Sequence, residues 1–529
     1  MDLKRVLISD PLAEEGIDIL KEVAAVDVKT GLSHAELLSI IGDYDALLVR
    51  SGTQVEADII DAGKKLKVIG RAGVGVDNID VAKATEMGIL VINAPGGNTI
   101  SAAEHTMAMM MALTRNITNA CSSLRCGEWK RGKFVGVELY RKKLGVVGFG
   151  RIGQEVAIRA RSFGMEILAY DPYIPNELIE KQGYTPVTLD QLFTNADIIT
   201  VHAPKTSDTK YLINADVLNK MKDGVRIINV ARGGLVDEKA LYDAIESGKV
   251  AGAALDVFET EPPEDSPLLQ LEQVVCTPHL GASTAEAQIK VAVQVAEQFV
   301  RLFKGEPVQM AVNAPILPPE AMAEVEPFIP LMNMMGSFYM QLFGGRIKSV
   351  DITYSGEVSV YPAAPMTTAL LIGLLQVILK TNVNYVNAPP IAKQRGISIE
   401  ENKSKSASIY RSLITVKVTT EEGTATIAGT LFEGSEMRIV QLDGYNIEVI
   451  PSRYLLVNRY HDRTGVVGKV GTLLGNNNIN IASMQVGRNL QRGEAMMILQ
   501  VDSPVLPEII AELQGDDLMI KSSFIELPL

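Results

Sequence analysis

Three side chains of the sequence have the types that the oxidation of an alcohol requires, and each follows a short apolar run. The runs cover residues 226–230, 251–257 and 274–277. His279 can take a hydroxyl proton near neutral pH, and the carboxylate of Glu261 can hold that imidazole in one tautomer. The guanidinium of Arg232 can bind a substrate carboxylate through two hydrogen bonds and polarise the carbonyl that forms. We interpret Arg232, Glu261 and His279 as the catalytic set of a dehydrogenase.

The chain has five histidines, and the surroundings of His279 point to catalysis because it lies between proline and glycine just past a predicted strand. We expect His34 to lie at the surface and His105 to pack within a helix. His202 ends a predicted strand and has a structural interpretation, and His461 lies far along the chain from the three catalytic candidates.

A glycine-rich turn, Gly148-Phe-Gly-Arg-Ile-Gly153, follows the apolar run Lys143–Val147 and opens a helical pattern. Gly148 would make the tight turn, Gly150 would let the backbone approach a pyrophosphate, and Gly153 would let helix pack on strand. Asp171 ends the next predicted strand, eighteen residues after Gly153. A carboxylate there accepts hydrogen bonds from ribose hydroxyls and repels a 2′-phosphate, so we expect NAD rather than NADP. A flavin site, a nucleoside site or a structural turn remain alternatives.

Apolar runs alternate with helical patterns through the first 310 residues or so, which predicts an α/β fold with two doubly wound parallel-sheet domains. Ligands bind at the carboxyl ends of the strands in such sheets, so these elements bring the polar residues to one edge. Long helices are expected from Ser101, with Glu104 completing a capping box, and from Thr284 to Phe303.

The character of the sequence changes after the proline-rich linker that begins at Asn313. Residues 348–450 mix β-branched strands and glycine turns with one apolar helix, which predicts an α+β domain. From about Arg453 the pattern predicts a small βαββαβ unit.

Composition excludes several classes of protein. The formal net charge is −13, which argues against nucleic acid or an anionic membrane as the main partner. The three cysteines lack the spacing of a metal site, so we expect no metal and a reduced, cytoplasmic environment. The longest apolar stretch, near 369–379, is too short to span a bilayer.

Taken together, the motifs at 148–153, 229–234, 259–263 and 278–283 resemble the signature set of the D-isomer-specific 2-hydroxyacid dehydrogenases. The resemblance implies a cofactor domain (98–282) inserted into a discontinuous substrate domain (1–97 and 283–312). It assigns catalysis to Arg232, Glu261 and His279. The NAD contacts that it implies are Val74, Gly148, Gly150, Arg151, Ile152, Gly153, Asp171, Ala203, Val230, Ala231, Asp256, Gly281 and Ala282. Ala203 is a departure, because many relatives have a hydroxyl residue at that position.

Within the family, the stretches that begin at Arg50 and Gly70 resemble the members that oxidise 3-phospho-D-glycerate to 3-phosphohydroxypyruvate, the first step of phosphorylated L-serine biosynthesis. A phosphate needs cations away from the reacting centre, and Arg50 and Arg71 both follow predicted strands. The substrate contacts that we predict are Arg50, Ser51, Arg71, Gly73 and Gly75.

The C-terminal third resembles the regulated, long members of that group. Residues 313–451 are similar to their intervening domain, and residues 452–529 resemble an ACT domain, a module that binds amino-acid effectors between subunits. The resemblance implies effector contacts at Tyr460, Asp462 and Asn480, L-serine as the candidate effector, and a homo-oligomer, dimer or tetramer. Thr464 departs from the proline that is common in such domains.

Two alternatives stay open from the sequence. One is another enzyme of the family, such as a glyoxylate or hydroxypyruvate reductase. The other is an NAD-sensing binding protein of the corepressor kind, which can keep the catalytic residues without turning over a substrate.

Overall fold

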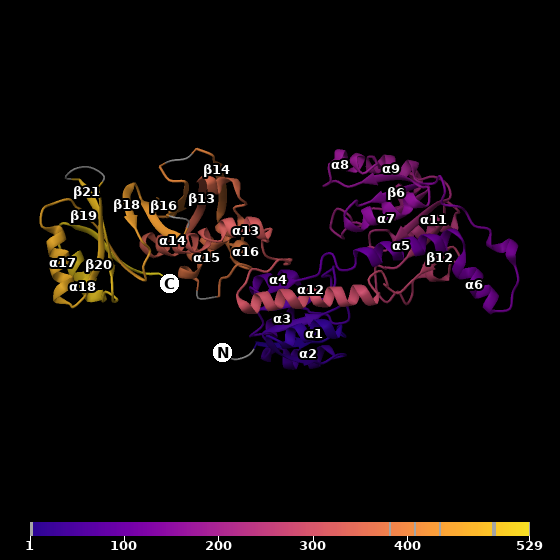
Figure 1. The fold of residues 1–529 in the computed structure, drawn as a ribbon, viewed down its shortest axis with the longest axis horizontal. Helices are drawn as coiled ribbons and strands as arrows, with labels where there is room; N and C mark the ends of the chain where they lie inside the picture. The colour runs from indigo at the N-terminus through magenta and orange to yellow at the C-terminus, as the bar shows by residue number, and fades with distance from the viewer. Residues whose placement is uncertain (1–3, 380–381, 407–408, 433–434, 489–492, 528–529) are drawn as a thin grey trace.

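Four sheets lie along an elongated molecule, with the second domain at one end, the first domain next to it, then the third, and the last domain at the other end (Figure 1). The computed structural model describes residues 4–379, 382–406, 409–432, 435–488 and 493–527. Among these described residues, no helix combines the length and apolar character needed to cross a bilayer.

The first domain contains a five-stranded parallel sheet of order β2-β1-β3-β4-β5. Its strands are β1 (Lys4–Ile8), β2 (Ala24–Val28), β3 (Ala46–Val49), β4 (Val68–Arg71) and β5 (Leu90–Ile92). Its helices are α1 (Glu14–Lys21), α2 (His34–Ile40), α3 (Ala57–Ala62), α4 (Val81–Glu86) and the 3-10 turn η1 (Ile41–Asp43). The long helix α12 (Ala285–Lys304) returns from later in the chain and lies across this domain (Figure 1), where Val295 and Phe299 join the core of the sheet.

The second domain is built on a seven-stranded parallel sheet of order β12-β11-β10-β9-β6-β7-β8. Its strands are β6 (Lys143–Val147), β7 (Glu166–Tyr170), β8 (Thr185–Pro186), β9 (Ile198–Val201), β10 (Val225–Asn229), β11 (Val250–Leu255) and β12 (Val274–Cys276). Its helices are α5 (Thr99–Thr114), α6 (Ile117–Arg125), α7 (Arg151–Ser162), α8 (Asn176–Lys181), α9 (Leu189–Asn195), α10 (Ala215–Lys220) and α11 (Glu238–Glu246), with η2 (Arg131–Phe134) and η3 (Pro267–Gln270). Two doubly wound parallel-sheet domains are therefore confirmed.

Helix termini in these domains test two local predictions. α12 begins after the N-cap Thr284, whose side chain accepts from the Ala287 amide, and it ends at the left-handed Gly305, close to the predicted limits. α5 begins at Thr99, two residues earlier than predicted, and its N-cap Asn98 makes no side-chain capping bond. The predicted capping box at the start of α5 was wrong, because the helix extends back beyond Ser101.

The third domain has a mixed six-stranded sheet of order β14-β13-β15-β16-β17-β18. Its strands are β13 (Ile347–Gly356), β14 (Ser398–Ser404), β15 (Ser412–Thr420), β16 (Thr424–Phe432), β17 (Glu436–Leu442) and β18 (Tyr445–Val449). Its helices are α13 (Pro319–Val325), α14 (Phe328–Phe343), α15 (Ala364–Ile378) and α16 (Ala388–Gln394), with the turn η4 (Glu357–Val360). The apolar helix expected between 348 and 450 is α15, whereas the short helix α16 was not predicted.

The last domain is a four-stranded antiparallel sheet of order β20-β21-β19-β22 with two helices. Its elements are β19 (Tyr454–His461), α17 (Val466–Asn476), β20 (Ile481–Arg488), β21 (Glu494–Val501), α18 (Pro507–Gln514) and β22 (Met519–Glu526). This order confirms the predicted βαββαβ unit. One sheet face, with Leu456, packs on α17 and α18, and the other, with Val457 and Ile498, joins the core of the third domain.

Candidate active site

The loops that follow β11 and β12 bring Glu261 and His279 together. Nδ1 of His279 lies 2.7 Å from Oε2 of Glu261, and the backbone amide of Phe258 donates to Oε1 at 3.1 Å. Burial, the largest single influence, acts to raise the pKa of Glu261, but the hydrogen bond and charge of His279 together with the Phe258 amide outweigh it and keep that pKa below its usual value. An ionised carboxylate only accepts hydrogen bonds, so the imidazole proton lies on Nδ1 and Nε2 is free to accept a proton.

His279 has a left-handed backbone, with φ +55°, which is unfavourable for a residue other than glycine. Strain of this kind persists where surrounding contacts enforce it. The buried carboxylate of Asp256 provides such contacts, because it accepts from the amides of Leu280 at 2.7 Å and Gly281 at 2.8 Å. Asp256 thus fixes the turn that carries His279.

His105 is a site residue that the sequence analysis missed. It was expected to pack within its helix, but its Nε2 lies 3.2 Å from Oδ1 of Asp256 and 3.1 Å from Oγ1 of Thr277. Burial acts to raise the pKa of Asp256, but the hydrogen bonds from His105, Thr277 and two backbone amides hold that pKa below its usual value. The histidine therefore supports an ionised Asp256 beneath the catalytic turn.

Arg232 follows β10 and reaches across to the first domain. Its Nε donates to Oδ2 of Asp77 at 3.0 Å, and its Nη1 donates to the carbonyl of Ala231 at 2.7 Å. Its Nη2 lies against Gly75, where an added Cβ would stand only 2.0 Å away. The predicted carboxylate-binding arginine and the predicted substrate loop therefore meet at the boundary of the two domains.

Arg50 follows β3 and Arg71 ends the neighbouring strand β4, where it is paired with Val49. Neither arginine forms an ion pair with a described residue. Burial, followed by the positive charge of Arg232, lowers the pKa of Arg71 to about 10. Arg71 is still protonated at neutral pH, so this edge of the sheet carries positive charge that an anion would balance.

The turn after β6 fits a dinucleotide. Gly148 has φ +88°, and a Cβ on Gly153 would stand 2.1 Å from the carbonyl oxygen of Gly148. A Cβ on Gly150 would meet nothing within 4 Å, which leaves open space beside the N-terminus of α7 for a pyrophosphate. Asp171, at the end of β7, accepts from the Phe149 and Tyr173 amides at 2.9 Å each. These bonds fix its carboxylate beside the turn, where a ribose would lie.

The other predicted cofactor contacts lie around this turn and the adjoining strand ends. Arg151 donates from Nη1 to the carbonyl of Pro95 at 2.7 Å, and the carbonyl of Val74 accepts from Asn93 at 2.6 Å. A Cβ on Gly148 would stand 3.1 Å from the Ala203 amide, and one on Gly281 would stand 3.1 Å from the Val230 side chain. Ile152 lies in the first turn of α7, Ala231 precedes Arg232, and Ala282 follows Gly281.

His202 lies at the end of β9, beside the glycine turn. Its backbone carbonyl is 2.6 Å from the position of a Cβ on Gly148, and its Nε2 is 2.9 Å from Oγ1 of Thr200. Burial lowers the pKa of His202 to about 4, so the ring is neutral at physiological pH. This agrees with the structural interpretation of His202.

Of the predicted effector residues, Tyr460 lies in β19, Asp462 follows it and Asn480 precedes β20. Two of them already have partners within the chain. Asp462 is 3.4 Å from Nε of Arg488, and Asn480 donates to Asp502 at 2.6 Å. Tyr460 is buried under the helices of the domain. An ammonium group at Asp462 would therefore have to compete with the guanidinium of Arg488.

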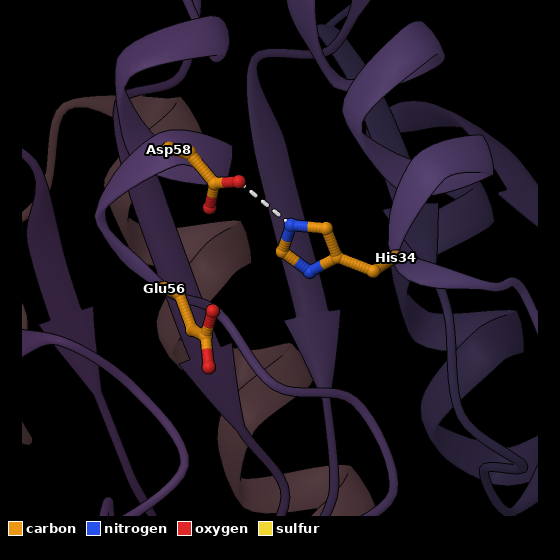
Figure 2. Close-up of side chains that lie close together, drawn as sticks. All are labelled: His34, Glu56 and Asp58. Carbon is orange, nitrogen blue, oxygen red and sulfur yellow. Dashed lines mark hydrogen bonds and ion pairs between the residues drawn. The ribbon is translucent and has the colours of Figure 1, made fainter.

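His34, Glu56 and Asp58 form an exposed cluster that joins α2 to α3 (Figure 2). Nε2 of His34 lies 2.7 Å from Oδ2 of Asp58, and this hydrogen bond raises the pKa of His34. The imidazole thus has an ion-pair partner at the surface, in keeping with the surface position expected for His34.

Comparisons with known proteins match three successive parts of the chain. The model of the D-isomer specific 2-hydroxyacid dehydrogenase NAD binding domain matches residues 107–281. The D-3-phosphoglycerate dehydrogenase intervening domain matches 324–443, and the ACT domain matches 453–516.

Full-length relatives share this organisation. A D-3-phosphoglycerate dehydrogenase of Synechocystis sp. is 49% identical over 512 residues, which cover 97% of this chain and 92% of the relative. One of Bacillus subtilis is 45% identical, with coverage of 99% and 100%. The structure of an Aquifex aeolicus D-lactate dehydrogenase, complexed with NAD and lactic acid, is 28% identical and superposes with a TM-score of 0.52 over 57% of this chain and 96% of that one. The chain therefore belongs to the D-isomer specific 2-hydroxyacid dehydrogenase family, among its D-3-phosphoglycerate dehydrogenases.

Proposed function

We propose that this chain oxidises 3-phospho-D-glycerate to 3-phosphohydroxypyruvate with NAD, the reaction that opens the phosphorylated route to L-serine. One observation carries the choice of substrate. Arg71 feels the positive charges of both Arg232 and Arg50, which together with burial lower its pKa, and neither Arg50 nor Arg71 has an ion pair with a described residue. A phosphate dianion would relieve this repulsion. The names of the full-length relatives support the same substrate.

The chemistry divides among three side chains. Nε2 of His279 takes the proton of the substrate hydroxyl, and Glu261, 2.7 Å from Nδ1, stabilises the imidazolium that results. Arg232 binds the substrate carboxylate, with the backbone of Gly73 and Gly75 beside it. Bound NAD supplies the acceptor for the hydride.

The phosphate of the substrate and the ribose of the cofactor are assigned to other residues at the strand ends. Arg50, Ser51 and Arg71 would hold the phosphate, which does not react. Asp171 would select NAD by accepting from its ribose hydroxyls.

The domain boundaries belong to this proposal as well. Residues 1–97 and 283–312 would form the substrate domain, 98–282 the cofactor domain, 313–451 the intervening domain and 452–529 the regulatory domain. We further propose a cytoplasmic homo-oligomer, dimer or tetramer, that binds L-serine through Tyr460, Asp462 and Asn480.

Turnover of 3-phospho-D-glycerate, D-glycerate, glyoxylate and hydroxypyruvate by the intact chain tests the substrate. Arg71→Ala should raise KM for 3-phospho-D-glycerate about tenfold or more with a smaller effect on kcat, because the phosphate is bound equally in ground and transition states. Arg5→Ala removes an exposed arginine of the same domain, paired with Asp27, and is the control. Faster turnover of the unphosphorylated acids would indicate a reductase of those substrates. NAD binding without turnover would indicate a binding protein.

A further inference from the structure

One amide side chain links the two arginines that we assign to the phosphate. Oδ1 of Asn78 accepts from Nε of Arg71 at 2.8 Å. Nδ2 of Asn78 donates to the carbonyls of Arg50 at 2.8 Å and Thr53 at 2.7 Å. The same side chain therefore fixes the guanidinium of one arginine and the backbone that carries the other.

The backbone of Asn78 is itself held in place. Its carbonyl accepts from the Val55 amide at 2.8 Å, and the carbonyl of Val55 accepts from the Asp80 amide at 2.9 Å. These bonds form a short parallel bridge between Val55 and Ile79. The loop after β3 and the loop after β4 are thus joined at this point, so movement of Asn78 would move both arginines.

We propose that Asn78 is a positioning residue that sets Arg50 and Arg71 at the spacing that a substrate phosphate requires. The inference rests on the proposed function, because it assumes that these arginines bind the phosphate. Arg50 and Arg71 repel each other, and Arg232 adds to the repulsion at Arg71. A rigid acceptor on Nε holds Arg71 in place and leaves its two terminal nitrogens for the ligand.

The neutrality of the amide is part of this role. A carboxylate at position 78 would accept from Nε of Arg71 equally well, but its negative charge would neutralise the arginine and repel a phosphate dianion. The neighbouring acid that is buried, Asp10, is already engaged by the amides of Arg50 at 2.6 Å and Thr53 at 3.1 Å. Asparagine fixes the cation without consuming its charge.

Asn78→Ala and Asn78→Asp separate these two contributions. We expect Asn78→Ala to raise KM for 3-phospho-D-glycerate about tenfold, since it removes a hydrogen bond to a charged group. Asn78→Asp should raise it further, about thirtyfold or more, although it restores the acceptor. In both variants kcat should change less than KM, and kcat/KM for D-glycerate and the Kd for NAD should stay within about twofold.

Asn313→Ala is the matched control, because Asn313 also anchors backbone in the first domain. Its side chain accepts from the Val91 amide at 2.8 Å and donates to the Ile89 carbonyl at 2.9 Å, away from the arginines. It should lower Tm without changing the preference for the phosphorylated substrate. Equal losses for 3-phospho-D-glycerate and D-glycerate in the Asn78 variants, or a smaller loss in Asn78→Asp than in Asn78→Ala, would overturn the inference. If the unaltered chain does not use 3-phospho-D-glycerate, the proposed function itself fails instead.

Discussion

Glu261→Gln tests the catalytic pair with almost no change of shape. Glu261 uses one oxygen for the Phe258 amide at 3.1 Å and the other for Nδ1 of His279 at 2.7 Å. Glutamine has a single side-chain oxygen. If that oxygen keeps the bond to Phe258, the amide NH₂ faces Nδ1, which must then accept. The imidazole proton moves to Nε2, and the nitrogen that should take the substrate proton is blocked.

The size of the effect follows from this change of tautomer. Loss of a general base typically lowers turnover by about 10²–10⁴. The His279 and Glu261 side chains are 43% and 38% exposed, so water can reach the ring and help to restore the productive tautomer. We therefore expect the lower end of that range, a fall in kcat of about a hundredfold, which corresponds to about 2.7 kcal/mol of activation free energy.

The assay is steady-state oxidation of 3-phospho-D-glycerate, with the Kd for NAD measured separately to show that the cofactor site is intact. Glu259→Gln is the control, because it removes the same charge two residues away. Glu259 accepts a hydrogen bond from the hydroxyl of Tyr211 at 2.9 Å. Among the described residues, no hydrogen bond or ion pair joins Glu259 to His279. A Glu261→Gln enzyme within about threefold of the unaltered rate, or an equal loss in Glu259→Gln, would refute the reasoning.

Four further outcomes are expected. His279→Ala should lower kcat about a hundredfold or more while NAD still binds; a loss of less than about threefold contradicts the assignment of the base. Asp171→Ala should erode a strong preference for NAD over NADP, and equal kcat/KM of the unaltered enzyme with both cofactors would exclude that role. Calorimetry should detect L-serine binding that Asp462→Ala abolishes; no heat at millimolar L-serine would leave the last domain as an assembly module. Asn458→Leu should raise Tm, because both polar atoms of this fully buried side chain lack a hydrogen-bond partner among the described residues. Each such atom costs the folded state about 1–3 kcal/mol, so an unchanged or lower Tm would argue against this cost.

The sheets and the strand ends that carry polar residues were predictable from local patterns. A parallel sheet brings the ends of its strands to one edge, so the motifs near Arg232, Glu261 and His279 could be grouped without knowing any contact. The first-domain loop that holds Asn78 was singled out only through its resemblance to the family members that oxidise 3-phospho-D-glycerate.

Partners far apart in the sequence were not predictable in the same way. Asp77 pairs with Arg232 across 155 residues, and His105 reaches Asp256 across 151. Neither Asp77 nor His105 lies in a motif with a recognisable spacing to its partner. Each contact forms only because the packing of whole domains places a loop or a helix beside its partner. The local periodicity of the sequence does not reveal that placement.

The helices of the third domain were under-predicted for a different reason. α14 is apolar nearly all round, since most of its side chains are buried between α15 and the sheet. A helix without a polar face lacks the amphipathic period by which a helix is recognised in a sequence.

The sheet of the last domain has a bearing on how the C-terminal half unfolds. Leu455, Val457 and Ile525 lie in one continuous apolar cluster with Ile352 and Met335 of the third domain. Since apolar burial is the main source of cooperativity, residues 313–529 should lose structure in a single calorimetric transition rather than in two. A chain cut after residue 451 would expose the third domain's share of that cluster and would be prone to aggregate. None of the described residues of the first two domains belongs to this cluster.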